Sequence, residues 1–318
     1  MQATAQAQPN IALVKYWGKR DVAENLPATG SISITLDSLW TRMSVDFGRS
    51  GTDRLLLNGQ PAEKMLPRVS QCLDAVAGKN RQAAEIVSEC NFPIAAGLAS
   101  SASAFAALVV AANEAAQGGH DLAALSRLAG KASGSAARSL FDGYVELVPR
   151  ANNIEVESLS VAAAWPLEVI VAITEESEKP VSSGEAMIRC AKTSPFYASW
   201  VDRQDEDLAE ARAAIDQRDF DKLAAVSEHN CLKMHSVMWA ARPPIVYWNK
   251  ATLASLQTVR ELQDAGVPVF FTIDAGPQVK AVCLPESARQ VREALAATQG
   301  VHSTMQSSLG AGARLVAS

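Results

Sequence analysis

The sequence lacks the excess of basic residues and the paired cysteines that mark several classes of protein. Its 318 residues include 29 Lys and Arg against 34 Asp and Glu, for a net charge of −5, whereas nucleic-acid-binding domains are usually basic. This balance leaves room for a local basic pocket. The five cysteines and four histidines are scattered, which disfavours a disulfide framework and a zinc site and favours reduced thiols. We therefore expect a cytoplasmic location and no nucleic-acid partner.

Features of membrane proteins and of ordinary phosphate-binding loops are also missing. The first ten residues have neither the basic start nor the apolar core of a signal peptide. No apolar run is long enough to cross a bilayer, so we expect no membrane partner. The Gly-Lys-Ser/Thr of a P-loop is absent. The composition, 48% hydrophobic and 20% charged, is ordinary for a globular protein of one large or two smaller domains.

One stretch, residues 91–108, joins turn-forming to helix-forming residues. Pro93 breaks any regular element and Gly97 permits a tight turn, whereas apolar residues recur at helical spacing from about Ser101. Small residues at a helix N-terminus suit a phosphate, because free N–H groups and the helix dipole attract anions. The pattern alone fits a capped, alanine-rich core helix equally well. In the phosphate interpretation, the hydroxyls come from Ser100, Ser101 and Ser103.

A second turn of small residues, Ser133 to Ser135, precedes Arg138. If a helix begins near Ser135, this spacing points Arg138 back toward the turn, and two hydroxyls with a guanidinium make an anion site. A helix break followed by an ordinary surface arginine explains the pattern equally well. Lys15 lies within an apolar stretch, which favours burial beside a charged partner.

The spacing of apolar residues predicts an α+β protein. Expected strands cover 11–16, 31–36, 40–47, 83–89, 144–148, 167–173, 267–273 and 279–284, with a hairpin at 55–60 and a short turn joining 31–36 to 40–47. Expected helices cover 62–77, a segment from about 101, 122–131 with Asp121 as its cap, 205–217, 220–239, 251–265 and 285–299.

The polar segment 149–164 carries no regular pattern, and we place a domain boundary there. The expected domains are residues 1–164, mainly antiparallel strands with packed helices, and residues 165–318, a compact α+β sandwich. A Gly-rich tail at 310–316 is expected to close the sheet of the second domain.

Taken together and in order, several motifs resemble one family over nearly the whole chain. They are NIALVKYWGKRD, NFPIAAGLASSASAFAAL, GSAARSLFDGYVEL, Val-Ser-Ser near residue 182, PPIVYWN and TIDAGPQ. The chain is similar to the diphosphomevalonate decarboxylases, the mevalonate-pathway members of the GHMP small-molecule kinase superfamily. The resemblance implies a two-lobed fold: a ribosomal-S5-like N-terminal lobe, a ferredoxin-like α/β sandwich as C-terminal lobe, and the active site in the cleft between them.

The resemblance also implies an activity and its partners. The expected reaction converts (R)-5-diphosphomevalonate and ATP to isopentenyl diphosphate, ADP, phosphate and CO2, through transient phosphorylation of the C3 hydroxyl. ATP would arrive with Mg²⁺, coordinated mostly by phosphate oxygens and water, so no dedicated metal ligands are expected in the sequence. The expected assembly is a homodimer.

Matching motif positions assign catalytic roles by resemblance. Asp274 would orient or deprotonate the C3 hydroxyl, and Lys15 would lie beside it and keep it ionised. Arg138 would hold the substrate carboxylate or its neighbouring phosphate, and Asn10 would lie near the reacting hydroxyl. An Asx-turn cap explains the local sequence around Asp274 equally well.

The resemblance assigns binding roles to further residues. The substrate diphosphate would contact Tyr16, Lys19, Ser133 and Ser135, together with Arg138. The ATP phosphates would be wrapped by Gly97, Leu98, Ala99, Ser100, Ser101 and Ser103. Ser182 and Ser183 are expected at the nucleotide or the reacting phosphate, and Ser88 and Asn91 on the adenine side.

One loop departs from the family pattern, and rival functions share the fold. Where many members carry a polar or basic residue after Val-Ser-Ser, this chain has Gly184, so no side-chain phosphate contact is expected there. The rivals are a mevalonate 3-kinase, a decarboxylase of the monophosphate, and a non-catalytic binding protein. Lys15, Asp274 and Arg138 together favour decarboxylation. A 5-diphosphate substrate is favoured by Tyr16, Lys19, Ser133 and Ser135.

Overall fold

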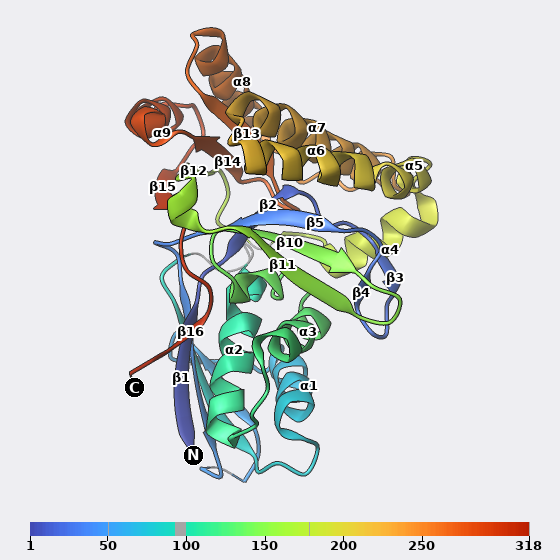
Figure 1. The fold of residues 1–318 in the computed structure, drawn as a ribbon, viewed down its shortest axis with the longest axis vertical. Helices are drawn as coiled ribbons and strands as arrows, with labels where there is room; N and C mark the ends of the chain where they lie inside the picture. The colour runs from blue at the N-terminus through green and yellow to red at the C-terminus, as the bar shows by residue number, and fades with distance from the viewer. Residues whose placement is uncertain (50, 93–99, 178, 318) are drawn as a thin grey trace.

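The computed structural model describes residues 1–49, 51–92, 100–177 and 179–317 of the chain. Within these residues, three larger sheets and one two-stranded ribbon are packed with helices. Figure 1 shows them arranged along the long axis, from the sheet that holds both chain ends to the helices α6, α7 and α8 at the opposite end. The architecture is α+β, as predicted.

The first sheet has six strands in the order β16-β1-β6-β9-β7-β8. Its neighbours are antiparallel, except that β7 runs parallel to β9. The strands are β1 (Gln2–Ala7), β6 (Thr41–Phe47), β7 (Arg54–Leu57), β8 (Gln60–Pro61), β9 (Ala84–Cys90) and β16 (Arg314–Val316). The helices packed with it are α1 (Leu66–Ala77), α2 (Ser100–Ala116) and α3 (Leu122–Ala132).

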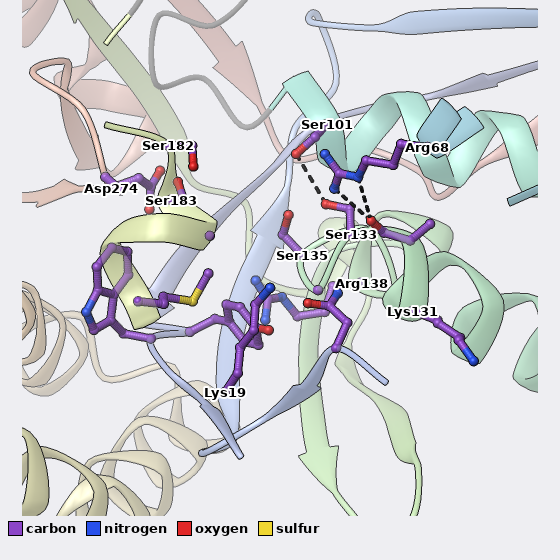
Figure 2. A pocket seen from close by; sticks show the side chains of 18 of the residues that line it. Lys19, Arg68, Ser101, Lys131, Ser133, Ser135, Arg138, Ser182, Ser183 and Asp274 are labelled. Carbon is purple, nitrogen blue, oxygen red and sulfur yellow. Dashed lines mark hydrogen bonds between the residues drawn. The ribbon is translucent and has the colours of Figure 1, made fainter. Parts of the chain in front are cut away.

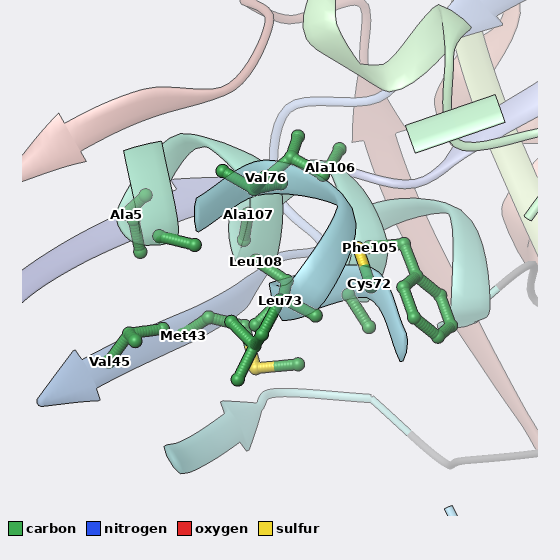
Figure 3. Packing of buried hydrophobic residues seen from close by; sticks show 14 of the residues in the cluster. Ala5, Met43, Val45, Cys72, Leu73, Val76, Phe105, Ala106, Ala107 and Leu108 are labelled. Atoms are coloured by element: carbon green, nitrogen blue, oxygen red, sulfur yellow. The ribbon is translucent and has the colours of Figure 1, made fainter. Parts of the chain in front are cut away.

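Helix α2 is apolar around most of its circumference because it is buried between the first sheet and helices α1 and α3. Small side chains such as Ala106 and Ala107 let its backbone lie close to its neighbours. Figure 3 shows these residues beside Leu73 of α1 and Val45 of β6. This close packing fixes the helix whose N-terminus begins at Ser100.

The second and third sheets each have four strands. The second, in the order β11-β10-β5-β2, comprises β2 (Asn10–Val14), β5 (Ser31–Thr35), β10 (Tyr144–Pro149) and β11 (Ile154–Ser160). The third, in the order β13-β14-β12-β15, comprises β12 (Glu168–Ile173), β13 (Val269–Ile273), β14 (Val279–Cys283) and β15 (Ser303–Ser308). The ribbon pairs β3 (Lys19–Asp21) with β4 (Leu26–Pro27).

The remaining helices belong to the second half of the chain, apart from the short 3-10 turn η1 (Arg138–Leu140). They are η2 (Ala162–Ala164), α4 (Ser183–Thr193), α5 (Tyr197–Asp202), α6 (Gln204–Gln217), α7 (Phe220–Trp239), α8 (Lys250–Asp264), η3 (Pro285–Ser287) and α9 (Ala288–Ala296). Among the described residues, no helix is both long enough and apolar enough to cross a membrane.

One apolar core joins the two halves of the chain. Leu13 of β2 packs in the same cluster as Val169 of β12, Phe270 of β13 and Leu208 of α6. The chain also returns at its end, where β16 pairs with β1. Side chains from distant parts of the sequence are therefore held in one rigid frame.

Several local predictions are confirmed. Helix α7 spans Phe220–Trp239, the predicted range, and the Asp121 side chain caps α3 by accepting a hydrogen bond from the Ala124 N–H. The predicted hairpin is formed by β7 and β8.

Three predictions about strands are wrong. Strands β5 and β6 belong to different sheets and do not form a hairpin, because β5 pairs with β2 and β10 while β6 pairs with β1 and β9. The segment 149–164 is not irregular, since β11 lies within it and pairs with β10. The C-terminal tail adds to the first sheet through β16 instead of closing the third sheet.

Candidate active site

A cavity of about 610 Å³ lies between residues of the two halves of the chain. Figure 2 shows Asp274, Ser182 and Ser183 on one side of it and Arg68, Ser133 and Lys131 on the other. Predicted site residues that line it are Asn10, Lys15, Tyr16, Lys19, Ser100, Ser101, Ser133, Ser135, Arg138, Ser182, Ser183 and Asp274. The structure thus brings these residues together around one cavity.

The cavity has two ends. The Asp274 end comprises Asn10, Lys15, Arg138 and Asp274, which line the cavity, together with Lys280, which pairs with Asp274 but does not line it. The Tyr16 end comprises Tyr16, Lys19, Arg68, Lys131, Ser133 and Ser135.

Asp274 immediately follows strand β13 and forms ion pairs with two lysines. Lys15 Nζ lies 2.7 Å from Oδ1 and Lys280 Nζ lies 3.2 Å from Oδ2. Burial alone would raise the pKa of this carboxyl, but the two ammonium groups lower it well below its usual range. The Asp274 side chain is 22% exposed, so an ionised carboxylate faces the cavity at neutral pH.

Lys15 is held in place by groups on its own strand and on helices α6 and α7. Its Nζ also donates to the Ala12 carbonyl at 2.8 Å. Its backbone N–H donates to Asn230 Oδ1, and its carbonyl accepts from Gln204 Nε2. The predicted proximity of Lys15 to Asp274 is confirmed, and the apolar surroundings explain why a charged partner is needed.

Arg138 is buried, contrary to the alternative that it is an ordinary surface arginine. It lies in the 3-10 turn η1, not in a helix that starts near Ser135. Its Nη1 donates to Ser31 Oγ and its Nη2 donates to Asn10 Oδ1 at 3.2 Å. Burial lowers its pKa to about 10, while Tyr16 and Asp274 oppose that change. The group is therefore a fixed cation.

Asn10 links Arg138 to the turn that precedes it. Its Nδ2 donates to the Ser135 carbonyl at 2.9 Å and to Ser139 Oγ at 2.8 Å. The Arg138 Nε has no hydrogen-bond partner among the described residues. A buried guanidinium with a spare donor beside a cavity can bind an anion.

The Tyr16 end is less enclosed and has more unused donors. Tyr16 Oη is buried with no partner among the described residues, and burial raises its pKa to about 12. Gly134 leaves room for the Tyr16 ring, since a Cβ at that position would lie 2.5 Å from Tyr16 Cζ and Oη. Burial, followed by the charge of Arg68, lowers the pKa of Lys19.

The chain is similar to known proteins over most of its length. Residues 7–160 match the description "Diphosphomevalonate decarboxylase-like N-terminal domain", and residues 169–314 match "Mevalonate 5-diphosphate decarboxylase C-terminal domain". The chain belongs to the diphosphomevalonate decarboxylase family. A curated diphosphomevalonate decarboxylase from Candida albicans is 35% identical over 86% of this chain and 82% of its own length.

Solved structures of the diphosphomevalonate decarboxylase family support the two-lobed GHMP kinase fold. The enzyme from Staphylococcus aureus superposes with a TM-score of 0.93 at 36% identity, covering 99% of this chain and 98% of that one. A complex of MDDEF with MVAPP, AMPPCP and magnesium superposes with a TM-score of 0.92 at 34% identity, covering 100% and 99%. The predicted fold is therefore confirmed.

Sequence reasoning missed three cationic residues of this decarboxylase-family site. Lys179 Nζ donates to Ser183 Oγ at 2.7 Å and to the Ala275 carbonyl at 2.8 Å, and burial lowers its pKa to about 8. Arg68 lines the cavity and donates to the Ala132 carbonyl. Lys280 lies in an apolar strand, the same signal that singled out Lys15. Neither Lys179 nor Arg68 has a comparable local signal.

Some predicted nucleotide contacts do not lie at the cavity. Ser103 Oγ bonds to Thr41 Oγ1 at 2.8 Å, on the buried side of α2. Ser88 is buried within β9. Asn91 Nδ2 donates to the Ser38 carbonyl, and its Oδ1 accepts from the Trp40 N–H. The side chains of Ser103 and Asn91 therefore form hydrogen bonds within the protein and do not face the cavity. The predictions for Gly97, Leu98 and Ala99 lie outside the described residues.

The two serines at the N-terminus of α4 do lie at the cavity. Ser182 caps α4 by accepting from the Glu185 N–H at 3.2 Å, and Ser183 accepts from Lys179. Gly184 also lines the cavity, and the nearest atom to a Cβ built there is Lys19 Nζ at 3.9 Å. The departure at this position therefore leaves space beside Lys19.

Proposed function

We propose that the protein converts (R)-5-diphosphomevalonate and ATP to isopentenyl diphosphate, ADP, phosphate and CO2, as a step of isoprenoid biosynthesis. The observation that carries the proposal is an ionised Asp274, paired with two lysines, in one cavity with the cations of the Tyr16 end. Such a cavity suits a substrate with several negative charges and one hydroxyl that must be aimed.

The chemistry is proposed to proceed in two stages. The C3 hydroxyl first takes the γ-phosphoryl group of ATP, which turns a poor leaving group into a good one. When phosphate departs, the C3–O bond breaks and leaves a cationic tertiary carbon. The bond from C2 to the carboxylate then breaks, its electron pair forms the double bond, and CO2 leaves.

Asp274 is assigned to aim the C3 hydroxyl. Its lowered pKa makes it a weak base, so accepting a hydrogen bond from the hydroxyl suits it better than full removal of the proton before transfer. Lys15, which also lines the cavity, can stabilise charge on the transferring phosphoryl group. Arg138 is assigned to the substrate carboxylate, and Asn10 keeps Arg138 in place.

The substrate diphosphate is assigned to the Tyr16 end. Tyr16 Oη and the side chains of Ser133 and Ser135 can donate hydrogen bonds, and Lys19 and Arg68 supply charge. Ser133 Oγ already lies 3.2 Å from Ser101 Oγ, so a hydroxyl at the end of α3 meets one in the first turn of α2. This supports the phosphate groups of the two substrates lying on either side of that contact.

The ATP phosphates are assigned to Ser100 and Ser101 at the N-terminus of α2 and to Ser182 and Ser183 at the N-terminus of α4. Lys179 Nζ donates to Ser183 Oγ and to the carbonyl of Ala275, the residue after Asp274. Serine hydroxyls suit Mg²⁺ as ligands beside phosphate oxygens. The ion would screen the charge of the phosphates.

Turnover of the purified protein with ATP, Mg²⁺ and carboxyl-labelled mevalonate tests the proposal. Free acid, 5-phosphate and 5-diphosphate are offered separately, and ADP and CO2 are followed together. Equal release of ADP and CO2 with the diphosphate alone is expected. ADP without CO2 would indicate a 3-kinase, and turnover of the monophosphate a different decarboxylase. No product with any of the three would overturn the proposed function.

The homodimer, the cytoplasmic location and the division at residues 164 and 165 remain predictions. Light scattering after size-exclusion chromatography gives the mass in solution, for which twice 33.7 kDa is expected. Separate expression of 1–164 and 165–318 tests the division. We expect both pieces to be poorly folded alone, because the apolar core that joins the two halves, with Leu13 and Val169 among its residues, draws side chains from both of them.

A further inference from the structure

The two lysines that pair with Asp274 differ in their access to the cavity. Lys15 is among the residues that line it, whereas Lys280 is fully buried and does not line it. Lys15 can therefore contact a bound substrate, and Lys280 cannot. The 3.2 Å contact between Lys280 Nζ and Asp274 Oδ2 belongs to the frame of the protein.

Lys280 projects from a rigid element. Strand β14 is paired on both sides, with β13 at Thr272 and with β12 at Val171. Because side chains alternate along a strand, Lys280 shares a face with Val282, which packs in the core cluster that contains Val14 of β2. The ammonium group is thereby held beside Asp274 in the interior of the protein, where it does not line the cavity.

Among the described residues, the groups that face Asp274 carry an excess of positive charge. His235 is neutral there, because burial lowers its pKa to about 3, and burial raises the pKa of the Cys231 thiol. The titratable and charged groups on the surrounding elements are Lys15 after β2, Arg138 in η1, Lys179 before α4, Cys231 and His235 in α7, and Lys280 in β14.

Negatively charged substrates reduce the excess of positive charge around Asp274 when they bind. On the proposed function, two chains of phosphate groups and a carboxylate enter the cavity, and nearby negative charge favours protonation of a carboxylate. Lys15, Lys179 and Arg138 border the cavity and would then interact with the substrates as well as with Asp274. Lys280 alone stays with Asp274.

We propose that Lys280 is a positioning residue that keeps Asp274 ionised and aimed while polyanionic substrates fill the cavity. Because Lys280 supplies a counter-charge from a position that does not line the cavity, Lys15 keeps positive charge for the transferring phosphoryl group. This inference rests on the proposed role of Asp274. Lys280 acts through Asp274 and touches no substrate.

The test compares pH profiles of kcat for the wild type, Lys280→Met and Lys280→Arg. Without the buried charge, the acidic limb of the Lys280→Met profile is expected to move up by about 1–3 pH units. Misaiming of the hydroxyl should lower kcat by up to about a hundredfold, with KM for both substrates within about threefold. Lys280→Arg keeps the charge, so its acidic limb should stay near that of the wild type.

A matched control is Val282→Ala, which removes buried volume on the same face of the same strand without changing a charge. It should lower thermal stability and leave the pH profile in place. If Lys280→Met behaves like Val282→Ala, Lys280 serves only the fold and the proposal fails.

If Lys280→Met does not fold, the wild type still tests the proposal. The carbon-13 signal of the Asp274 carboxyl, assigned by its loss in Asp274→Asn, is followed with the diphosphate substrate and AMPPCP bound. Ionisation down to about pH 4, near the ordinary pKa of Asp, is expected, and protonation at neutral pH on binding would overturn the proposal. Absence of CO2 release from the wild type, or full turnover by Asp274→Asn, would instead overturn the proposed function.

Discussion

The Asp274 end and the Tyr16 end of the cavity are both cationic, but they differ in how deeply their charged groups are buried and paired within the protein. At the Asp274 end, Lys15, Lys280 and Arg138 are at most 1% exposed and already have protein partners. At the Tyr16 end, Lys131 is 46% exposed and the Tyr16 hydroxyl has no partner among the described residues. The first is prearranged, and the second awaits a ligand.

This difference separates two tasks. Buried charges are costly unless they are paired, so the network at the Asp274 end holds its geometry only while it stays complete. Donors at the Tyr16 end gain their partners when an anion binds. Variants of the Asp274 end should therefore change kcat and stability, whereas variants of the Tyr16 end should change KM.

The largest effect is expected from Asp274→Asn. Loss of the aiming carboxylate should lower kcat by about 10²–10⁴-fold. Two buried ammonium groups would lose their counter-charge, which should cost about 3–5 kcal/mol of unfolding free energy. Turnover and denaturant unfolding measure both effects. The control is Asp205→Asn, in the first turn of α6. Full turnover by Asp274→Asn would remove the basis of the comparison.

Arg138→Met is expected to have the next largest effect. Removing a buried charged donor from the reacting centre should lower kcat by about 10²–10³-fold. Asn10 and Ser31 would lose hydrogen bonds, so the unfolding free energy should fall by about 1–3 kcal/mol. Steady-state kinetics and urea unfolding provide the measurements. Arg150→Met removes an exposed ion pair with Glu155 and should alter stability by about 0.5 kcal/mol or less. Similar results for both variants would contradict the role of Arg138.

A smaller and different effect is expected from Lys19→Met. Loss of one charge-assisted contact with the diphosphate should raise KM for that substrate about tenfold, which corresponds to about 1.4 kcal/mol. The kcat value should stay within about twofold. Lys131→Met is the matched control, because Lys131 lines the same end but pairs with Glu24 at the surface. A fall in kcat without a rise in KM would contradict the division between the two ends.

Features of the fold that depend on residues close in sequence could be predicted, whereas those that depend on contacts between distant segments could not. Helix α7 and the Asp121 cap depend on neighbouring residues, and both were predicted. Strands β5 and β6 were recognised, but alternation does not tell which partner a strand will take. The polar strand β11 was missed because most of its residues face solvent.

In the site, too, the contacts between distant segments were the harder part to predict. Lys15 and Asp274 were predicted as neighbours from motif residues. Lys280 was missed although its apolar flanks give the same signal as those of Lys15. Ser103 was grouped with Ser101, yet the helix turns its hydroxyl toward Thr41 and away from the cavity. Only the fold assigns faces to residues this close in sequence.

The smallest effect on catalysis is expected from Asn91→Ala. The Asn91 side chain joins the Trp40 N–H to the Ser38 carbonyl. Its loss should lower the unfolding free energy by about 1–2 kcal/mol and leave KM for ATP within about twofold. Ser101→Ala, which removes a hydroxyl that does line the cavity, should raise KM for ATP about threefold to tenfold with little loss of stability.

This pair of variants separates stability from nucleotide binding, because Asn91→Ala should lose stability without a change in KM for ATP and Ser101→Ala should do the reverse. Asn91 holds residues 38–40 against the end of β9, while Ser101 presents a hydroxyl beside Ser133. If Asn91→Ala instead raised KM for ATP as much as Ser101→Ala, the adenine-side role implied by resemblance would regain support. The assignment of the nucleotide to the N-termini of α2 and α4 would then need to be extended toward β9.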